Sequence, residues 1–259
     1  MTSITKALSP RQTAAEFASA LKQGALLGVG VAALAIPLWA TLGPPSPGQW
    51  PDRALTSPAA IEAPAVADVR PLVLVNFGAE EASADVQHMA NWVANSGDNQ
   101  ALFFVILDKL NAKVFVFDAN GTLQGASPVL IGAAKGDDSV ADIGSKPMHN
   151  VKEHERTTPA GRFVGEPGRN TNGEDIVWVD YDAAVSMHRV RAHEKTERRL
   201  QRLASASTLD NRISYGCINL PVEFFESVLQ PAFNQKRGVI YILPEIKSAR
   251  EVFKAAYSA

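Results

Sequence analysis

From residue 101 onward, short apolar runs alternate with polar turn signals, which is the pattern typical of β-strands joined by tight turns. Residues 118–121, for instance, read Asp-Ala-Asn-Gly and favour a reversal of the chain. A short helix is expected over 222–229, ended by Pro231. The pattern predicts a mainly β domain over 101–244, a barrel or sandwich with one or two short helices. The expected strands are 102–107, 113–117, 122–125, 129–132, 176–179, 184–187 and 239–243.

A shorter accessory segment, 72–100, precedes this domain. Residues 72–77 are rich in strand-forming side chains and predict a short strand. Residues 83–95 predict a helix that is capped by its first serine and ends at Gly97. The helix has one apolar stripe, which we expect to pack against the main domain: Met89, Trp92 and Val93. The last residues, 245–259, are interpreted as a C-terminal tail that can form a surface helix.

Residues 24–42 form an uncharged, largely apolar run that is long enough to cross a bilayer as one helix, with Trp39 suited to the interface. Residues 1–23 carry more basic than acidic side chains, which predicts a cytoplasmic tail. One alternative is a cleaved signal peptide processed near 33–35, and a buried helix of a globular protein is a third interpretation. Under the first two interpretations, the chain after residue 42 lies beyond the membrane.

Residues 43–71 connect this run to the folded part of the chain and are rich in proline and small side chains. Such a composition predicts a stiff, extended linker that holds a domain away from a membrane. The alternative is an ordered edge segment that lies over the domain.

The charge of the whole chain is nearly balanced, with a net charge of −2 and 46% hydrophobic residues among 259. Nothing in this balance indicates a nucleic-acid partner. The length allows one good-sized domain with appended segments. The sequence gives no indication of the oligomeric state.

Cys217 is the only cysteine in the chain, so it cannot form an internal disulfide. Gly216 before it lacks a Cβ, which permits a tight turn and the close approach of a substrate. Asn219 and Pro221 are typical of a helix start, and a cysteine just ahead of a helix favours its thiolate form. These features favour a nucleophile, although a buried structural cysteine is the alternative.

A cysteine nucleophile needs a base, and His188 is the best candidate. It follows the predicted strand 184–187, and an imidazole can take the thiol proton near neutral pH. A hydrogen-bonded core histidine is the competing interpretation.

At these residues the sequence resembles a known family. Residues 214–219, Ser-Tyr-Gly-Cys-Ile-Asn, resemble the Ser/Thr-His-Gly-Cys-apolar-Arg/Asn signature of the L,D-transpeptidases (the YkuD-type catalytic domain). Residues 156–163 resemble the family's Thr-Pro-x-Gly-x-Phe stretch, and 186–188 resemble the strand that ends in its catalytic histidine. The resemblance covers roughly 102–243. It departs at Tyr215, where the family usually has histidine, and in the longer gap between His188 and Ser214.

The resemblance implies a cysteine acyltransferase in the bacterial cell envelope, with a single-pass inner-membrane anchor and a periplasmic catalytic domain, or a secreted form if the segment is cleaved. Cys217 would attack the L-centre carbonyl of diaminopimelate in a peptidoglycan stem tetrapeptide, and terminal D-alanine would leave. An amine acceptor would then resolve the thioester. The backbone N–H groups of Gly216 and Cys217 are the expected oxyanion donors, and the phenol of Tyr215 is a further donor. Ser214 and Asn219 are expected to line the substrate site.

Two other functions stay open. In an L,D-carboxypeptidase or amidase, water would resolve the same thioester, and a peptidoglycan-binding module would carry out no chemistry. No cofactor is expected, and a metal site at His149 and His154 is not expected because no cysteine or well-spaced carboxylate accompanies them.

The long segment between His188 and Ser214 is basic. Residues 189–212 hold seven Lys or Arg against three Asp or Glu, a net charge of +4. Arg198, Arg199 and Arg212 are candidates to meet the carboxylates of a stem peptide from a lid or wall. A solvated helix of mixed charge is the alternative.

Overall fold

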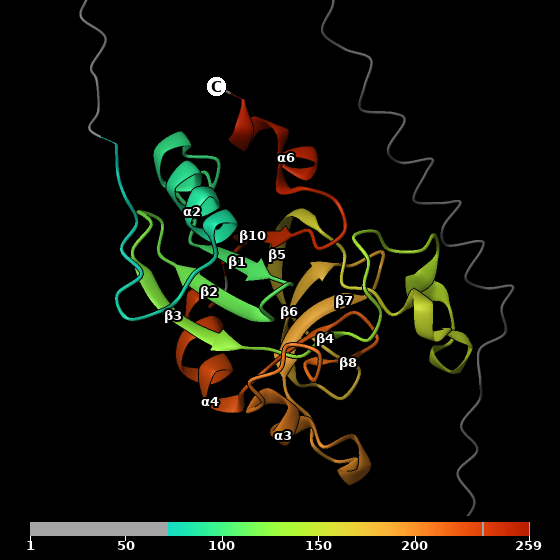
Figure 1. Cartoon of the computed structure of the whole chain (residues 1–259). Coiled ribbons are helices and arrows are strands. Elements are labelled where there is room, and N and C mark those ends of the chain that lie inside the picture. Colours follow the sequence, from blue (N-terminus) through green and yellow to red (C-terminus); the bar gives the residue numbers. More distant parts are fainter. Residues whose placement is uncertain (1–71, 235, 259) are drawn as a thin grey trace, which may run out of the picture. The chain divides into compact units, whose positions relative to one another are not determined.

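The computed structural model describes residues 72–234 and 236–258 (Figure 1). The predicted tail 1–23, membrane segment 24–42 and linker 43–71 therefore lie outside the described residues. Within the two described ranges, no helix combines the length and the apolar character needed to span a bilayer.

Most of the strands form one eight-stranded sheet in the order β3-β2-β1-β10-β5-β6-β7-β9, which confirms a mainly β domain. Neighbouring strands are antiparallel except for the parallel pairs β1–β10 and β7–β9. The strands of this sheet are β1 (Phe104–Asp108), β2 (Lys113–Phe117), β3 (Leu123–Pro128), β5 (Gly161–Arg169), β6 (Asp175–Asp180), β7 (Val185–Arg189), β9 (Ile218–Leu220) and β10 (Gly238–Leu243). A separate parallel pair consists of β4 (Ile131–Gly132) and β8 (Arg212–Ser214).

The two ends of the large sheet meet at an isolated bridge between Leu130 and Asn219. Each residue donates its backbone N–H to the other's carbonyl, at 2.9 and 2.8 Å. Leu130 follows β3 and Asn219 lies in β9, the two edge strands. The sheet therefore curls into a nearly closed barrel, and the bridge lies two residues from Cys217.

Strand β1 shows how the core is divided, because its side chains alternate between two apolar clusters. Val105 and Leu107 point into the barrel, where Phe225 and Leu229 close one end. Phe104 and Ile106 point to the outer face, which is covered by α2 (Ala84–Ser96) and the C-terminal helices. Figure 1 shows α2 and α6 on the same side of β1 and β10, with α4 on the opposite side near β3.

Helix α2 matches the prediction for 83–95. Its N-cap is Ser83, whose hydroxyl accepts a hydrogen bond from the N–H of Val86, and its C-cap is Gly97 with a φ of +70°. Met89 and Val93 are fully buried, and Trp92 packs against the same cluster. The expected C-terminal helix is present as two short turns, α6 (Ala249–Val252) and η6 (Lys254–Tyr257).

The predicted strand over 72–77 is wrong, because this segment is extended without pairing to another strand. The N–H groups of Val73 and Val75 donate instead to the side-chain oxygens of Asn95 and Asn91 on α2, each at 2.8 Å. Two asparagine side chains thus take the place of a neighbouring strand.

The predicted helix start at Asn219 is also wrong, because Asn219 lies in β9 and the helix begins three residues later. The helical segment runs through α4 (Val222–Phe224), a π-helical turn η5 (Phe225–Leu229) and α5 (Gln230–Ala232). Pro231 lies inside it rather than ending it. The expected dipole effect of a helix start directly after Cys217 is therefore absent.

The remaining helical turns are short and lie in the loops. Turns η1 (Ile143–Ser145), η2 (Met148–Asn150) and η3 (Glu153–Glu155) precede β5. The basic segment after β7 contains η4 (Lys195–Glu197) and α3 (Arg199–Leu203).

Candidate active site

The parallel pair β7–β9 places the resembling motifs side by side. Met187 pairs with Ile218 and His188 with Asn219. The side chains of Met187 and Ile218 belong to the barrel core, so His188 and Asn219 lie on the other face of the pair. Cys217, two residues before Asn219, contacts that same face. The cysteine thus lies beside Ser186, two residues before His188 on β7.

The thiol of Cys217 is half-buried and held by two groups from β7 and the turn before it. Its Sγ lies 3.6 Å from Oγ of Ser186 and 3.5 Å from the carbonyl oxygen of Ala184. Among the described residues, no hydrogen bond joins Sγ to His188. The sulfur is therefore held beside the hydroxyl rather than the imidazole.

The ring of His188 is held in one tautomer. Its Nδ1 lies 2.8 Å from the carbonyl oxygen of Arg189, which only accepts, so Nδ1 carries the proton and Nε2 is the unprotonated nitrogen. Burial lowers the pKa of His188, and the positive charges of Arg191 and Arg199 lower it further against the effect of the carbonyl. His188 is thus kept as a neutral base.

Asn219 links the base to the cysteine and to the basic segment. Its Nδ2 lies 3.4 Å from Nε2 of His188 and 3.2 Å from the carbonyl oxygen of Cys217. Its Oδ1 accepts a 2.5 Å hydrogen bond from Arg199 of α3. The side chain is buried, and every polar atom of its amide has a partner.

The turn before the cysteine is closed by Ser214, whose hydroxyl accepts from the N–H of Gly216 at 3.1 Å and donates to the carbonyl of Cys217 at 2.6 Å. Gly216 has a φ of +124°, and a Cβ there would lie 2.7 Å from the backbone oxygen of Thr157. Only glycine fits this position. The N–H of Gly216 is therefore engaged within the turn, and the oxyanion role of the Gly216 and Cys217 N–H groups stays a prediction.

Thr158 joins the second resembling segment to the cysteine turn. Its buried hydroxyl accepts from the N–H of Gly132 at 2.9 Å and donates to the carbonyl of Gly216 at 2.8 Å. The sequence motif pointed to this segment, but nothing in the sequence singled out the threonine's contact.

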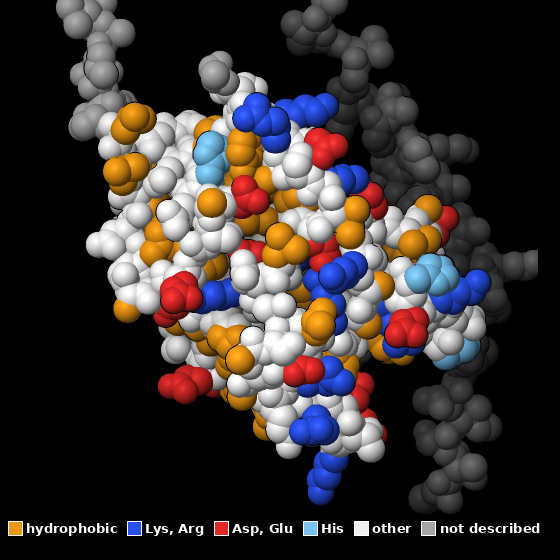
Figure 2. Space-filling model, in the orientation of Figure 1, with side chains coloured by type: hydrophobic (Ala, Val, Ile, Leu, Met, Phe, Trp, Pro, Cys, Tyr) orange, Lys and Arg blue, Asp and Glu red, His pale blue; other side chains and the backbone are white. Residues whose placement is uncertain are grey.

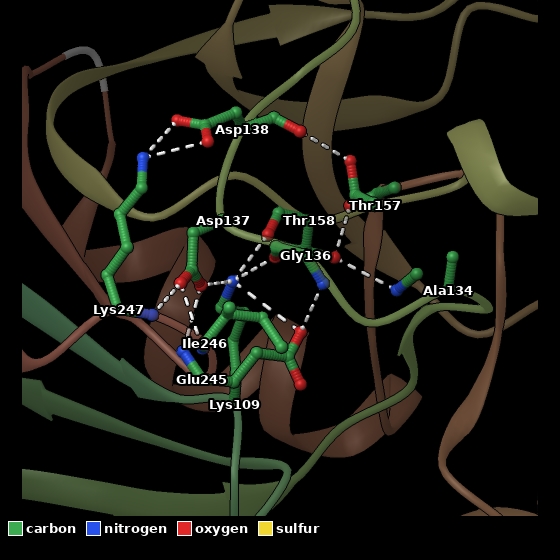
Figure 3. A network of polar contacts seen from close by, with 12 residues as sticks. Lys109, Ala134, Gly136, Asp137, Asp138, Thr157, Thr158, Glu245, Ile246 and Lys247 are labelled. Atoms are coloured by element: carbon green, nitrogen blue, oxygen red, sulfur yellow. Dashed lines mark hydrogen bonds and ion pairs between the residues drawn. The ribbon is translucent and has the colours of Figure 1, made fainter.

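A buried ionic network lies behind Thr158 (Figure 3). Nζ of Lys109 donates to the carbonyl of Thr158 and to Asp137 Oδ1, each at 2.8 Å, and lies 3.6 Å from Glu245. Burial would raise the pKa of Asp137, but hydrogen bonds from Lys109 and from the N–H groups of residues 245–247 lower it to about 2. The network thus holds the backbone carbonyl of Thr158, whose hydroxyl donates to the cysteine turn.

Arg212, a predicted substrate-binding residue, belongs to this network. Its guanidinium pairs with Glu245 and approaches the carbonyls of Gly132 and Ala134, and its side chain is 10% exposed. A direct contact between Arg212 and a substrate stays a prediction, and it would require this ion pair to open.

The other arginines of the basic segment are also mostly engaged. Arg199 pairs with Glu197 at 2.6 Å as well as with Asn219, and Arg198 donates to Gln201 at 3.3 Å. Outside α3, arginines 189 and 191 pair with glutamates 226 and 174. Figure 2 shows blue and red side chains intermixed on the part of the surface where α3 lies in Figure 1. The predicted positive charge is thus largely compensated, and Arg199 reaches inward to the site.

Tyr215 is 38% exposed beside the cysteine. The guanidinium carbon of Arg156 lies 4.0 Å from the centre of its ring. The phenol is therefore paired with a cation that the sequence did not single out.

The described residues hold a further feature that could bind a ligand, a cavity away from Cys217. A cavity of about 600 Å³ lies elsewhere in the barrel, between the end of β2 and the helical segment near Pro231. No group of three or more His, Cys, Asp or Glu within residues 72–234 and 236–258 is arranged to hold a metal ion.

Comparisons with known proteins give limited similarity. No family model and no curated protein matches the chain. Among solved structures, the chain is similar to one titled "Structure of LD transpeptidase LdtMt1 in complex with imipenem", with 15% identity and a TM-score of 0.31. The match covers 54% of this chain and 58% of the other, so this chain spans little more than half of that protein's length.

Proposed function

We propose that this chain is a cysteine acyltransferase of the L,D-transpeptidase type that acts on peptidoglycan stem peptides. The observation that carries the proposal is the contact of Cys217 with Ser186, on the face of β7 that also carries His188, whose unprotonated Nε2 accepts a hydrogen bond from Asn219. The substrate class comes from the resemblance of three sequence segments to that family. Contacts such as the Thr158–Gly216 hydrogen bond join these segments in space and support the same proposal.

The chemistry begins with a rotation of the cysteine side chain. In this proposal, rotation about the Cα–Cβ bond of Cys217 takes the thiol away from Ser186, and Nε2 of His188 exchanges its hydrogen bond with Asn219 for one with the thiol. His188 takes the proton, and the thiolate attacks the L-centre carbonyl of diaminopimelate. The tetrahedral oxyanion is stabilised by the N–H of Cys217, and by that of Gly216 when Ser214 releases it. His188 then returns the proton to the amine of the departing D-alanine.

The thioester is resolved by an amine of a second stem. That amine loses a proton to His188 as it attacks, and the thiolate of Cys217 is regenerated. If water took the place of the amine, the product would be a shortened stem, as in a carboxypeptidase.

The test is incubation of the full chain with purified muropeptides, followed by mass spectrometry. We expect a cross-linked dimer and a covalent adduct on Cys217, and neither with Cys217→Ala. A carbapenem, which the family resemblance implies as an acylating agent, should add to the same sulfur. A trimmed monomer would identify a hydrolase, and binding without product would identify a peptidoglycan-binding module. An active Cys217→Ala variant would remove the nucleophile assignment.

The location of the site is part of the proposal. Residues 24–42 would anchor the chain in the inner membrane, with the catalytic domain in the periplasm. Protease added to spheroplasts should digest the domain but spare a tag at the N-terminus. Protection of the domain would contradict this orientation.

A further inference from the structure

Arg156 carries an incompletely paired guanidinium beside the cysteine turn. Its Nε is buried without a hydrogen-bond partner in the described part of the chain. Its Nη2 makes one long bond, 3.4 Å, to the carbonyl of Val151, and no carboxylate in that part of the chain pairs with it. A guanidinium has five N–H donors, and a buried donor without a partner costs about 1–3 kcal/mol. Such a group in a folded protein requires an explanation.

Among the described residues, Nε of Arg156 is the buried side-chain nitrogen or oxygen atom that has no hydrogen-bond partner. Arg199 and Arg212 each hold a carboxylate, as do the arginines of β7 and of the residues just after it. Arg198 and Arg202 have no carboxylate either, but they donate to Gln201 and to backbone carbonyls, whereas Nε of Arg156 has no acceptor.

Tyr215 fixes the plane of this guanidinium. The guanidinium carbon of Arg156 lies 4.0 Å from the ring centre, the geometry of a cation–π contact. A planar fork held in this way suits a bidentate contact with a carboxylate. The exposed phenol can add a further donor.

The backbone near Arg156 runs directly beside the nucleophile. The next residue, Thr157, has its carbonyl oxygen against Gly216, where a Cβ would come within 2.7 Å. Thr158 donates its hydroxyl to the carbonyl of Gly216 at 2.8 Å. A ligand held by Arg156 and Tyr215 would therefore lie next to the acyl site.

We propose that Arg156 and Tyr215 form a carboxylate-binding subsite that selects the donor stem peptide. This inference rests on the proposed function for the identity of the ligand. Two carboxylates of a donor tetrapeptide adjoin the reacting carbonyl: the terminus of the leaving D-alanine and the D-centre carboxylate of diaminopimelate. The side chains act by binding and orientation, and they take no part in proton transfer.

The experiment measures binding without turnover, in the full-length Cys217→Ala protein. The ligands are the stem tetrapeptide and two analogues, one with a D-alanine carboxamide and one with a D-centre carboxamide. We expect one of the amides to bind roughly tenfold to a hundredfold more weakly than the tetrapeptide, which identifies the recognised carboxylate. Adding Arg156→Met should abolish that difference, and Arg156→Lys should restore part of it because the charge returns without the planar fork.

Arg250→Met is the matched control. The guanidinium carbon of Arg250 also lies over a tyrosine, 5.5 Å from the ring centre of Tyr257, but this pair belongs to the C-terminal helices. It should leave the amide selectivity unchanged. The inference is overturned if Arg156→Met and Arg156→Lys, each verified as folded by its melting temperature, keep the selectivity of the parent, or if the parent binds all three peptides equally. Acylation of the wild-type protein is scored separately. Selectivity without acylation would overturn the proposed function alone, and acylation without Arg156-dependent selectivity would overturn this subsite alone.

Discussion

The amide nitrogen of Asn219 lies 3.4 Å from Nε2 of His188 and donates to the nitrogen that must accept the cysteine proton. A protonated imidazole cannot accept this hydrogen bond, so the contact stabilises the neutral ring. The amide is itself held by Arg199, whose charge also lowers the pKa of His188. Burial is the main cause of the lowered pKa of His188, and Arg199 of helix α3 adds to it.

Replacing Arg199 with methionine should raise the pKa of His188. The change removes one of the positive charges near the ring and releases the amide of Asn219, whereas Arg191 and Glu174 remain. Because the base works in its neutral form, the acidic limb of kcat/KM for acyl-enzyme formation should move to higher pH. The neighbouring variant Arg202→Met is the control, because Arg202 bonds only to backbone carbonyls of Glu197 and Asp210. An acidic limb at the same pH in wild type and Arg199→Met would contradict this role.

The buried network around Lys109 should make the free energy of unfolding depend on pH. The pKa of Asp137 is about 2 in the folded protein against an ordinary value of 3.8. The folded state therefore binds its proton less readily than the unfolded state. The ionised carboxylate of Asp137 therefore stabilises the folded state by about 2 kcal/mol. This stabilisation is present above pH 3.8 and is lost as the pH falls toward 2.

Urea unfolding at a series of pH values measures this contribution. Asp137→Asn should be less stable than wild type at neutral pH, and the difference should shrink toward pH 2. Asp138→Asn, at an exposed neighbour that pairs with Lys247, should show a small difference at every pH. A constant penalty for Asp137→Asn across the range would mean that the carboxylate's charge is not the cause.

Removing the Lys109 side chain should lower the free energy of unfolding far more than removing that of Lys113, a lysine nearer the surface. Lys109→Met leaves the carboxylate of Asp137 buried without its cation and leaves Glu245 with Arg212 alone, which costs about 3–5 kcal/mol. Lys113→Met is the matched control, because Lys113 pairs with Glu80 at the surface and should lose less than about 1 kcal/mol. The measurement is the free energy of unfolding in urea at neutral pH. Equal losses would show that burial of the Lys109 network adds nothing.

The strands that the sequence predicted are those with uninterrupted apolar or alternating runs, such as β1, β2 and β10. Strand β5 was missed because Gly165, Pro167 and Gly168 interrupt its pattern. It forms because β10 and β6 pair with it on both sides, a tertiary effect that local propensity does not contain. The helix start assigned to Asn219 failed for the same reason, since pairing with β7 outweighs the capping preference of asparagine.

Likewise, only some residues of the candidate site could be predicted from the sequence. Cys217 and His188 are recognisable from residue type and local context. Lys109, Arg156 and Thr158 are not, because each acts through partners far away in the chain: Lys109 reaches Thr158, and Thr158 reaches Gly216. Residue spacing along the chain cannot reveal contacts of this kind when one sequence is read alone. Arg156 attracts attention only because the structure leaves its buried Nε without a hydrogen-bond partner in the described part of the chain.

Gly216 is expected to tolerate no side chain, for two reasons that can be separated. Its φ of +124° strains any other residue, and an added Cβ would meet the rigid backbone oxygen of Thr157 at 2.7 Å. Gly216→Ala should therefore lose roughly 1–3 kcal/mol or more of stability and should displace Cys217, so that acyl-enzyme formation is largely lost. Gly173→Ala has the first problem without the second, since its φ is +78° and nothing lies within 4 Å of the added Cβ. That variant should lose only about 1 kcal/mol and keep full acylation. Intact-mass kinetics and urea unfolding measure both effects, and a Gly216→Ala protein that acylates at the wild-type rate would show that the tight turn is not what positions the sulfur.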